Sequence, residues 1–479
     1  MSIASYFKLV EQQTLDNVHE ASLNLLSNTG IVFNSDECVD IFKSHGARVD
    51  GHTVYLPEAM VNHALEAVPP DFTWEARNPD RTIRVNIAEP GIHVSLNSGP
   101  VYIQDLDHGR RMGTEQDLVN LYKLAQHSDT CTIVGQIPVN PSDITHPFRH
   151  LDIFHHLLAQ SDKPLFGYVG STEQIAQMFD LMKLSLGYSL EDDRVFDKHR
   201  IAVSLNPLSP LRYDDIPCET LLAYARAGQP IMILTCAMAG VTAPVNPMGT
   251  VVLQNTEILA GLVLAQLVKP GTPVVYSPAS AVPDLRTAAY MTGLPVSNMI
   301  NMVGIQMARE CYKLPTRCMA GLTDAKIPDC QAGYETMQNY LMLAMAGVDM
   351  VNECFGILDS VMTVSYEKFI LDDEIMARTA QLLKGIDNFE PDYSVSAISK
   401  TGHGGSYLMD ASTLTHCRNF WTPPVSIFDS YEAWAKKGAL EALRNANKAF
   451  KDILFNCPDQ VIEPDIDRDL AEYIDRIKE

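Results

Sequence analysis

Along most of the chain, short runs of apolar and β-branched residues alternate with longer segments in which apolar residues recur every three or four positions. The short runs predict strands, and the longer segments predict helices with one buried face. Eight runs predict strands, and they span residues 92–96, 132–139, 164–169, 200–205, 230–236, 273–277, 316–320 and 350–355.

Helical patterns follow these runs in turn. They span residues 114–127, 147–160, 172–186, 215–227, 251–268, 285–313, 329–346 and 366–384. Thr114 and Ser171 each precede acidic residues, so their hydroxyls are expected to cap the first helical turns. Eight alternating units favour a (β/α)8 TIM barrel in the α/β class, and a doubly wound open sheet is the alternative.

The start of the chain has a different pattern. Residues 1–90 predict an N-terminal α/β cap section, with an amphipathic helix at 16–28 and hairpin-like segments around Tyr55 and Trp74. We expect this section to pack on the barrel, which then spans residues 91–386.

The end of the chain, residues 387–479, predicts a C-terminal accessory section with a helical extension at 431–454. Its glycines Gly402, Gly404 and Gly405 do not form a dinucleotide loop, because the third glycine of GxGxxG is missing and no strand precedes them.

The composition is that of a soluble globular protein, with 46% hydrophobic and 20% charged residues. No segment supplies roughly 18 uninterrupted apolar residues for a membrane span, and the start lacks a signal-peptide pattern. The ten cysteines form no CxxC pair, which favours reduced, mostly buried thiols and a cytoplasmic protein. A net charge of −23 makes nucleic acid an improbable partner, because binding phosphates needs a basic surface.

Active sites of such barrels lie at the carboxyl ends of the strands. The residues at the predicted strand ends are Asn97, Gln104, Gln136, Tyr168, Asn206, Thr235, Met238, Tyr276, Ser277, Gly321, Asp324, Glu353 and Phe355. Amides, hydroxyls and aromatic rings dominate this set, and clusters of His, Cys and carboxylates are scarce, which argues against a metal centre. The chain also lacks a GxSxG nucleophile elbow and a GxxxxGK[ST] phosphate loop.

The segment 316–335 is the most informative part of the chain. Its apolar run breaks at Gly321 into a polar loop with Asp324 and Lys326, as a barrel strand delivers groups to a pocket. A salt bridge within the loop is the alternative reading of the two charged residues. Glu257 stands in an otherwise apolar helix, so it either stabilises the helix start or faces the pocket.

The segment 316–335 resembles the active-site loop of the trimethylamine methyltransferase family. Further blocks at 235–240, 257–271, 356–360 and 369–374 resemble the same family in the same order. The resemblance implies a (β/α)8 barrel that passes a methyl group from an amine to the Co(I) of a separate corrinoid protein.

The resemblance also singles out two positions. Family members that act on trimethylamine carry pyrrolysine where this chain has Gly321 or Leu322, so no electrophilic imine is expected here. Glu257 matches a family glutamate beside pyrrolysine. The catalytic candidates are Gly321, Glu257 and Asp324.

The missing pyrrolysine favours a substrate that is already activated. A quaternary ammonium ion releases a neutral tertiary amine in one in-line displacement, so the enzyme needs only to position it and exclude water. Glycine betaine is the first candidate, and proline betaine, carnitine and γ-butyrobetaine follow the same logic.

Aromatic faces hold quaternary ammonium ions, with about 0.5 to 2 kcal/mol for each contact. The predicted cage residues are Phe355, Tyr276, Tyr168 and Tyr102. A substrate carboxylate needs a donor, for which the candidates are Arg317, Arg212, His403 and Asn206. Arg317 is four residues before Gly321, an even spacing, so the two would share a strand face.

Two other classes stay open at this point. The chain could be a non-catalytic barrel that binds quaternary amines, and a barrel lyase or metal hydrolase would require a bound metal. No Asp-x-His-x-x-Gly loop for cobalt is present, so the resemblance implies that cob(I)alamin is carried by the partner protein and that this chain binds no cofactor.

Overall fold

The computed structural model describes residues 6–89, 91–135, 137–287 and 289–479. Its centre is a parallel sheet whose eight strands pair in the order β14, β13, β11, β10, β9, β6, β18 and β17. These strands are β6 (His93–Ser95), β9 (Cys131–Gly135), β10 (Leu165–Phe166), β11 (Ile201–Leu205), β13 (Ile231–Thr235), β14 (Val274–Pro278), β17 (Arg317–Met319) and β18 (Met350–Asn352). Each lies within or beside one of the eight predicted runs.

The sheet closes into a barrel because its two edge strands, β14 and β17, meet. Tyr276 and Thr316 form a parallel bridge between them, and the Tyr276 amide donates a hydrogen bond of 2.9 Å to the carbonyl of Pro315. The closure decides for the barrel and against the open sheet.

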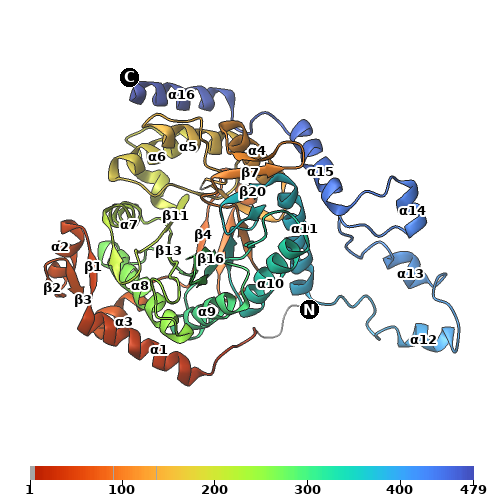
Figure 1. Cartoon of the computed structure of the whole chain (residues 1–479), viewed down its shortest axis with the longest axis horizontal. Helices are drawn as coiled ribbons and strands as arrows, with labels where there is room; N and C mark the ends of the chain where they lie inside the picture. The colour runs from red at the N-terminus through yellow and green to blue at the C-terminus, as the bar shows by residue number, and fades with distance from the viewer. Residues whose placement is uncertain (1–5, 90, 136, 288) are drawn as a thin grey trace.

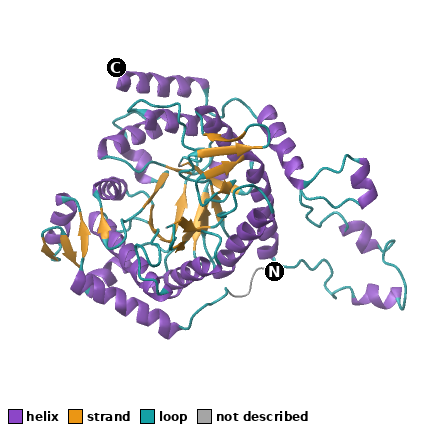
Figure 2. Cartoon of the chain, in the orientation of Figure 1, coloured by secondary structure: helices purple, strands orange, loops and turns teal. Residues whose placement is uncertain are grey.

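A ring of helices surrounds the barrel (Figures 1 and 2). The helices are α4 (Glu115–His127), α5 (Arg149–Gln160), α6 (Thr172–Ser185), α7 (Asp215–Ala227), α8 (Pro247–Val268), α9 (Pro295–Gln306), α10 (Cys330–Ala346) and α11 (Tyr366–Lys384). Thr114 and Ser171 form capping boxes at the starts of α4 and α6, as the sequence predicts.

Two predicted helices differ from the structure. The first part of 285–313 lies in a hairpin of β15 (Val282–Asp284) and β16 (Ala289–Met291), and α9 begins only at Pro295, where the fixed φ of proline suits a first helical position. The predicted helix 431–454 is two helices, α14 (Tyr431–Lys436) and α15 (Ala442–Asn456), because Gly438 adopts a φ of +99° between them.

The N-terminal section packs on the outer wall of the barrel, chiefly against α8, rather than over the strand ends (Figure 1). Its strand β1 also pairs with β12, a short strand in the loop after β11. The elements are α1 (Gln12–Asn24), a π-helical turn (Leu25–Thr29), β1 (Ile31–Phe33), α2 (Asp36–Ser44), β2 (Arg48–Asp50), β3 (Thr53–Tyr55), α3 (Glu58–Ala67) and β12 (Arg212–Tyr213).

The hairpin of β4 (Asp71–Trp74) and β5 (Ile83–Asn86) closes the amino end of the barrel. Trp74 is fully buried and meets Phe166 edge-on at a centroid distance of 5.1 Å. With Met232 and Val275 from inside the barrel, they form an apolar layer that fills this end.

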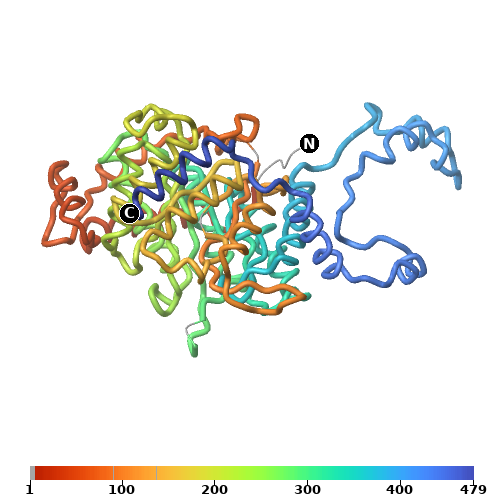
Figure 3. The backbone as a smooth tube through the Cα atoms, turned by 90° about the horizontal axis from the view of Figure 1, so that it is seen from above, coloured from red at the N-terminus to blue at the C-terminus, as the bar shows by residue number. Residues whose placement is uncertain are grey.

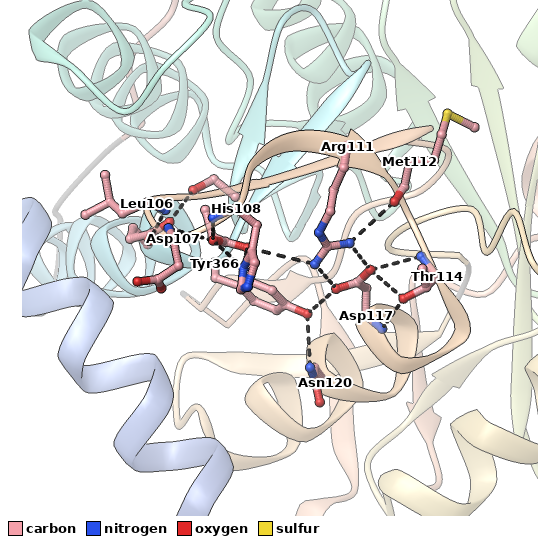
Figure 4. Close-up of polar contacts among 12 residues, drawn as sticks. Leu106, Asp107, His108, Arg111, Met112, Thr114, Asp117, Asn120 and Tyr366 are labelled. Atoms are coloured by element: carbon pink, nitrogen blue, oxygen red, sulfur yellow. Dashed lines mark hydrogen bonds and ion pairs between the residues drawn. The ribbon is translucent and has the colours of Figure 1, made fainter.

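At the carboxyl end, a second sheet joins β7 (Tyr102–Asp105), β8 (Gly109–Met112), β19 (Ile357–Leu358) and β20 (Thr363–Ser365). Figure 4 shows Asp117 of α4 at the centre of the polar contacts beside it, where it accepts hydrogen bonds from Arg111, Thr114 and Tyr366. Burial raises the pKa of Asp117, but these bonds outweigh burial and leave it below its usual value. The network therefore ties β8, α4 and α11 together.

Helix α8 is long and apolar enough to cross a membrane by length and composition alone. However, 83% of its most apolar 18-residue window is buried inside the protein. It is a core helix between the barrel and the N-terminal section.

The C-terminal section leaves the barrel as an arm, residues 386–441, which projects sideways and returns (Figure 3). It carries α12 (Val395–Thr401), α13 (Ala411–His416) and α14. Beyond the arm, α15 packs on α11, and α16 (Pro464–Lys478) packs on α5 and α6.

Candidate functional site

A cavity of about 630 Å³ lies at the carboxyl ends of the barrel strands. Most of its wall comes from the ends of β11, β13, β17 and β18 and from the loops that follow. The lining residues are Ser98, Val169, Ser204, Leu205, Asn206, Pro217, Leu234, Cys236, Met238, Tyr290, Arg317, Met319, Asn352, Glu353 and Val361.

Arg317 is the cation of this cavity. Its side chain is 2% exposed, and its Nε and Nη1 have no hydrogen-bond partner among the described residues. Burial lowers the pKa of the guanidinium, yet arginine keeps its charge at neutral pH. A buried donor without a hydrogen-bond partner raises the free energy of the folded protein. This side of the cavity therefore favours an anion with two acceptor oxygens.

Glu353 is the carboxylate of the same cavity. The amide of Ser98 donates to both carboxylate oxygens at 3.0 Å, and Asn352 Nδ2 donates to Oε1 at 3.0 Å. Burial raises the pKa of Glu353 to about 7. Its backbone has a φ of +56°, a sparsely populated conformation that the surrounding strand end must hold.

The rest of the wall is mostly apolar. Tyr290 is the aromatic residue among the described lining residues, and its hydroxyl donates a hydrogen bond of 2.6 Å to the carbonyl of Ala279. This bond fixes the ring on the β15–β16 hairpin. Sulfur atoms of Met238 and Met319 add polarizable surface.

The cavity opens outward through a second hollow of about 830 Å³. The two share Asn206, Pro217, Cys236 and Met238. The outer hollow continues along the loop after β11, past Leu208.

The sequence model of the trimethylamine methyltransferase (MTTB) family matches residues 2–479. The chain belongs to this family. It is 34% identical to the glycine betaine methyltransferase of Desulfitobacterium hafniense (strain Y51), over 98% of this chain and 96% of the relative. It is 31% identical to the proline betaine:corrinoid methyltransferase of Eubacterium limosum, over 87% of this chain and 86% of that one.

A solved structure shares the fold of this family member. The monomethylamine methyltransferase MtmB of Methanosarcina barkeri superposes with a TM-score of 0.56, over 95% of this chain and 90% of that chain, at 12% identity. The likeness confirms the barrel fold.

Two of the predicted substrate-binding residues, Asn206 and Arg317, line the same cavity. Arg212, the third donor candidate, lies in the outer hollow and pairs with Asp214 at 2.5 Å. His403 is exposed on the C-terminal arm. The structure thus brings together only part of the predicted carboxylate-binding set.

The four predicted cage residues are not among the described residues that line the cavity. Tyr276 is buried in the core, where its hydroxyl donates to Asn255 Oδ1 at 2.9 Å, and Phe355 stacks on Phe369. Tyr102 lies under the guanidinium of Arg110. Tyr168 lies half-buried beside Val169, which does line the cavity.

Gly321 also lies outside the described cavity lining. A Cβ at this position would lie 2.2 Å from the carbonyl oxygen of Glu353 and 2.4 Å from Cys354 Cα. The backbone after β18 therefore fills the space in which a side chain at residue 321 would start. Leu322, the other candidate for the pyrrolysine position, is buried as well.

Asp324 holds loops together rather than lining the described cavity. It accepts hydrogen bonds from the Thr292 and Gly293 amides at 2.9 Å and from Ser360 Oγ at 2.7 Å. The alternative of a salt bridge between Asp324 and Lys326 is wrong, because Lys326 pairs with Asp359 at 2.6 Å instead.

Glu257 is buried under the loop after β11. It accepts hydrogen bonds of 2.8 Å from Ser209 Oγ and from the Leu211 amide, and burial raises its pKa to about 7. It is not among the described lining residues, and its hydrogen bonds anchor the loop that carries Asn206.

Sequence reasoning missed two important residues of the cavity. Tyr290 was missed because the pattern of residues 285–313 predicts one continuous helix. Glu353 was named only as a residue at the end of a predicted strand. A carboxylate directly after the buried strand Met350–Asn352 was the available signal for Glu353. Gln136, another predicted strand-end residue, lies outside the described residues.

Across the described parts of the chain, no three His, Cys, Asp or Glu side chains are grouped to hold a metal ion. The described lining residues of the cavity offer one cation, one carboxyl group, amides, hydroxyls, a thiol, thioethers and a phenol ring.

Proposed function

We propose that this chain transfers a methyl group from glycine betaine to Co(I) of a separate corrinoid protein, leaving dimethylglycine. The observation that carries the proposal is Arg317, a buried guanidinium with two unpaired nitrogens that shares an apolar cavity with Glu353. A betaine has the matching charges, a carboxylate and a quaternary ammonium group.

The two charged residues suit the two ends of such a substrate. The carboxylate would accept hydrogen bonds from Arg317, and Asn206 lines the same cavity as a further donor. The ammonium group would lie near Glu353 and the ring of Tyr290. The names of the two relatives, which act on glycine betaine and proline betaine, support the same substrate class.

The reaction needs no proton transfer. The electron pair of Co(I) forms the bond to the methyl carbon, and the electrons of the breaking C–N bond stay on nitrogen, which leaves as a neutral amine. The chain's own contribution is to bind the zwitterion, aim one methyl group outward and keep water away. A cavity with few titratable groups is sufficient for that work.

Substitution of Arg317 tests this proposal. In Arg317→Met, we expect KM for glycine betaine to rise at least tenfold, because the substrate carboxylate loses a charged donor pair, a loss of about 1.5 to 3 kcal/mol. The measurement is the absorbance change as methylcobalamin forms from free cob(I)alamin.

Tetramethylammonium is the matched control, since it has the cation without the carboxylate. Its use should be unchanged in Arg317→Met, and Arg317→Lys should restore part of the glycine betaine activity. Equal KM values for glycine betaine in wild type and Arg317→Met would refute the role of Arg317. No methyl transfer from any quaternary amine would instead favour a non-catalytic binding barrel.

A larger betaine is the second candidate. A cavity of about 630 Å³ has room beyond what glycine betaine fills, and one relative acts on proline betaine. Comparison of kcat/KM for glycine betaine, proline betaine, carnitine and γ-butyrobetaine decides among them. A cytoplasmic location stays a prediction.

A further inference from the structure

Exposed apolar side chains gather on one side of the cavity entrance. Leu208 and Ile216 belong to the loop after β11, Val241 and Val245 to the loop after β13, and Leu285 to the β15–β16 hairpin after β14. Each is between 42% and 67% exposed. We call these five residues the entrance rim.

The entrance rim is continuous with the cavity. Leu208 and Ile216 line the outer hollow together with Met238, which also lines the inner cavity. A methyl group added at Gly240 would lie 3.0 Å from Leu285 Cδ2 and 3.6 Å from Val245 Cγ2, so the loop after β13 touches the hairpin.

The β15–β16 hairpin makes the entrance rim project from the barrel. In Figure 3 it is the green segment that projects from one end of the barrel, near residue 285, whereas the C-terminal arm projects from the side. Tyr290 of the same hairpin lines the inner cavity. One element therefore reaches both the substrate and the outermost surface.

Two arginines beside the entrance rim are paired within their own loops, whereas Asp215, which lines the outer hollow, has no ion pair among the described residues. Arg212 binds Asp214 at 2.5 Å, and Arg286 binds Asp284 at 3.1 Å. The border is thus close to neutral in a chain with a net charge of −23. An apolar patch with a balanced border is typical of a protein interaction site.

We propose that the entrance rim is the surface on which the corrinoid protein docks, an inference that rests on the proposed function. Whatever covers the rim also covers the entrance, because both hollows share Asn206 and Met238. A permanent partner would block substrate entry and product release. The occupant must arrive and leave in each cycle, as a methyl acceptor does.

The position of the entrance rim also suits the geometry that methyl transfer requires. The cobalt must come within bonding distance of a methyl group inside the cavity, so the acceptor has to face the entrance directly. The rim occupies one side of that entrance, which suits a small interface that releases quickly.

The test places a charge on the entrance rim. The probe is the cognate corrinoid-binding protein, loaded with cobalamin. In Leu285→Glu and Val245→Glu, we expect its Kd, from isothermal titration, and its KM as methyl acceptor to rise tenfold or more, because a carboxylate must be desolvated on docking. Methyl transfer from glycine betaine to free cob(I)alamin should match wild type.

Leu382→Glu is the matched control, on an exposed residue near the carboxyl end of α11 that is outside the described lining of both hollows. It should leave both acceptor reactions unchanged. A Kd for the corrinoid protein that stays at the wild-type value in both rim variants overturns the docking proposal. So does an equal loss with free cob(I)alamin, since the hairpin would then shape the cavity instead.

The two proposals fail separately. If wild type transfers no methyl group to free cob(I)alamin, the proposed function fails, whereas the titration still measures docking. If wild type is active but the rim variants shift its oligomeric state and not its affinity for the corrinoid protein, the rim is a contact between copies of this chain and the docking proposal is wrong.

Discussion

At the residue scale, the cavity combines two opposite charges taken from neighbouring strands. Arg317 lies on β17, and Glu353 follows β18, which pairs with β17 in parallel. Both side chains are almost fully buried, so the net cost of desolvation stays high until a ligand neutralises them. A zwitterion with separated charges satisfies both at once.

Glu353 predicts how substrate affinity depends on pH. Its pKa of about 7 means that it is mostly neutral below that pH, and a quaternary ammonium ion binds the ionised form better. We therefore expect the Kd of glycine betaine to fall as pH rises from 6 to 8, by up to roughly tenfold. Titration calorimetry across this range measures it.

Two variants check the assignment. Glu353→Gln should make the Kd nearly independent of pH, because its side chain has no proton to lose. Glu257→Gln should keep the pH dependence, although burial also raises the pKa of Glu257 to about 7, since Glu257 is not among the described residues that line the cavity. A flat profile in Glu257→Gln would contradict our reading.

At the element scale, loops rather than strands decide the shape of the cavity. The loop after β11 carries Asn206 into the cavity and is anchored from below by Glu257 of α8. Asp324 similarly binds Thr292, before α9, and Ser360, in the loop after β18. Glu257 and Asp324, two of the three predicted catalytic residues, thus anchor neighbouring loops.

Removing the anchor under the loop after β11 should loosen Asn206. In Glu257→Ala, Ser209 Oγ and the Leu211 amide lose their acceptor, which costs about 1 to 3 kcal/mol of stability. We expect a lower midpoint of thermal unfolding and a higher KM for glycine betaine. Glu257→Gln keeps an acceptor oxygen and should restore KM; a variant with unchanged KM and midpoint would argue against anchoring.

At the scale of the whole molecule, a ring of helices surrounds the barrel, while the arm 386–441 extends away from it (Figures 1 and 3). The arm exposes large apolar side chains, among them Tyr393, Phe420, Phe428 and Tyr431. Its backbone has few buried contacts, so it belongs to the least stable part of the chain.

Limited digestion with chymotrypsin should therefore cut the arm first. The two fragments should stay together on gel filtration, because Phe450 of α15 stacks on Tyr366 at 4.9 Å and Tyr473 of α16 binds Asp180 at 2.9 Å. Phe455 is an internal control, since it is 88% exposed but lies inside helix α15 and should resist cleavage. First cuts within the barrel, identified by mass spectrometry, would contradict this order of stability.

The proposed sections 1–90, 91–386 and 387–479 remain a prediction about independent units. The packing of α1 and α3 on α8 and of α15 on α11 joins the outer two sections to the barrel. Within the last section, only the arm stands clear of it (Figure 3).

The sequence by itself determined that eight strands alternate with eight helices. Periodicity and turn residues are local features of the sequence. The eight strands, their succession along the chain and the capping of α4 and α6 were therefore predictable. The helix 285–313 was wrong at its start because an apolar hairpin and an apolar helix have similar composition over a few residues.

Only the tertiary structure decided which strand-end residues meet. Arg317 lines the cavity without Gly321, and no local pattern shows that Phe355 and Tyr276 turn into the core or that the backbone of Glu353 fills the space at Gly321. Such facts depend on contacts between segments far apart in sequence, and closure of the barrel creates them. The sequence thus determined the succession of elements and the charge of Arg317, and closure of the barrel decided which residues Arg317 faces.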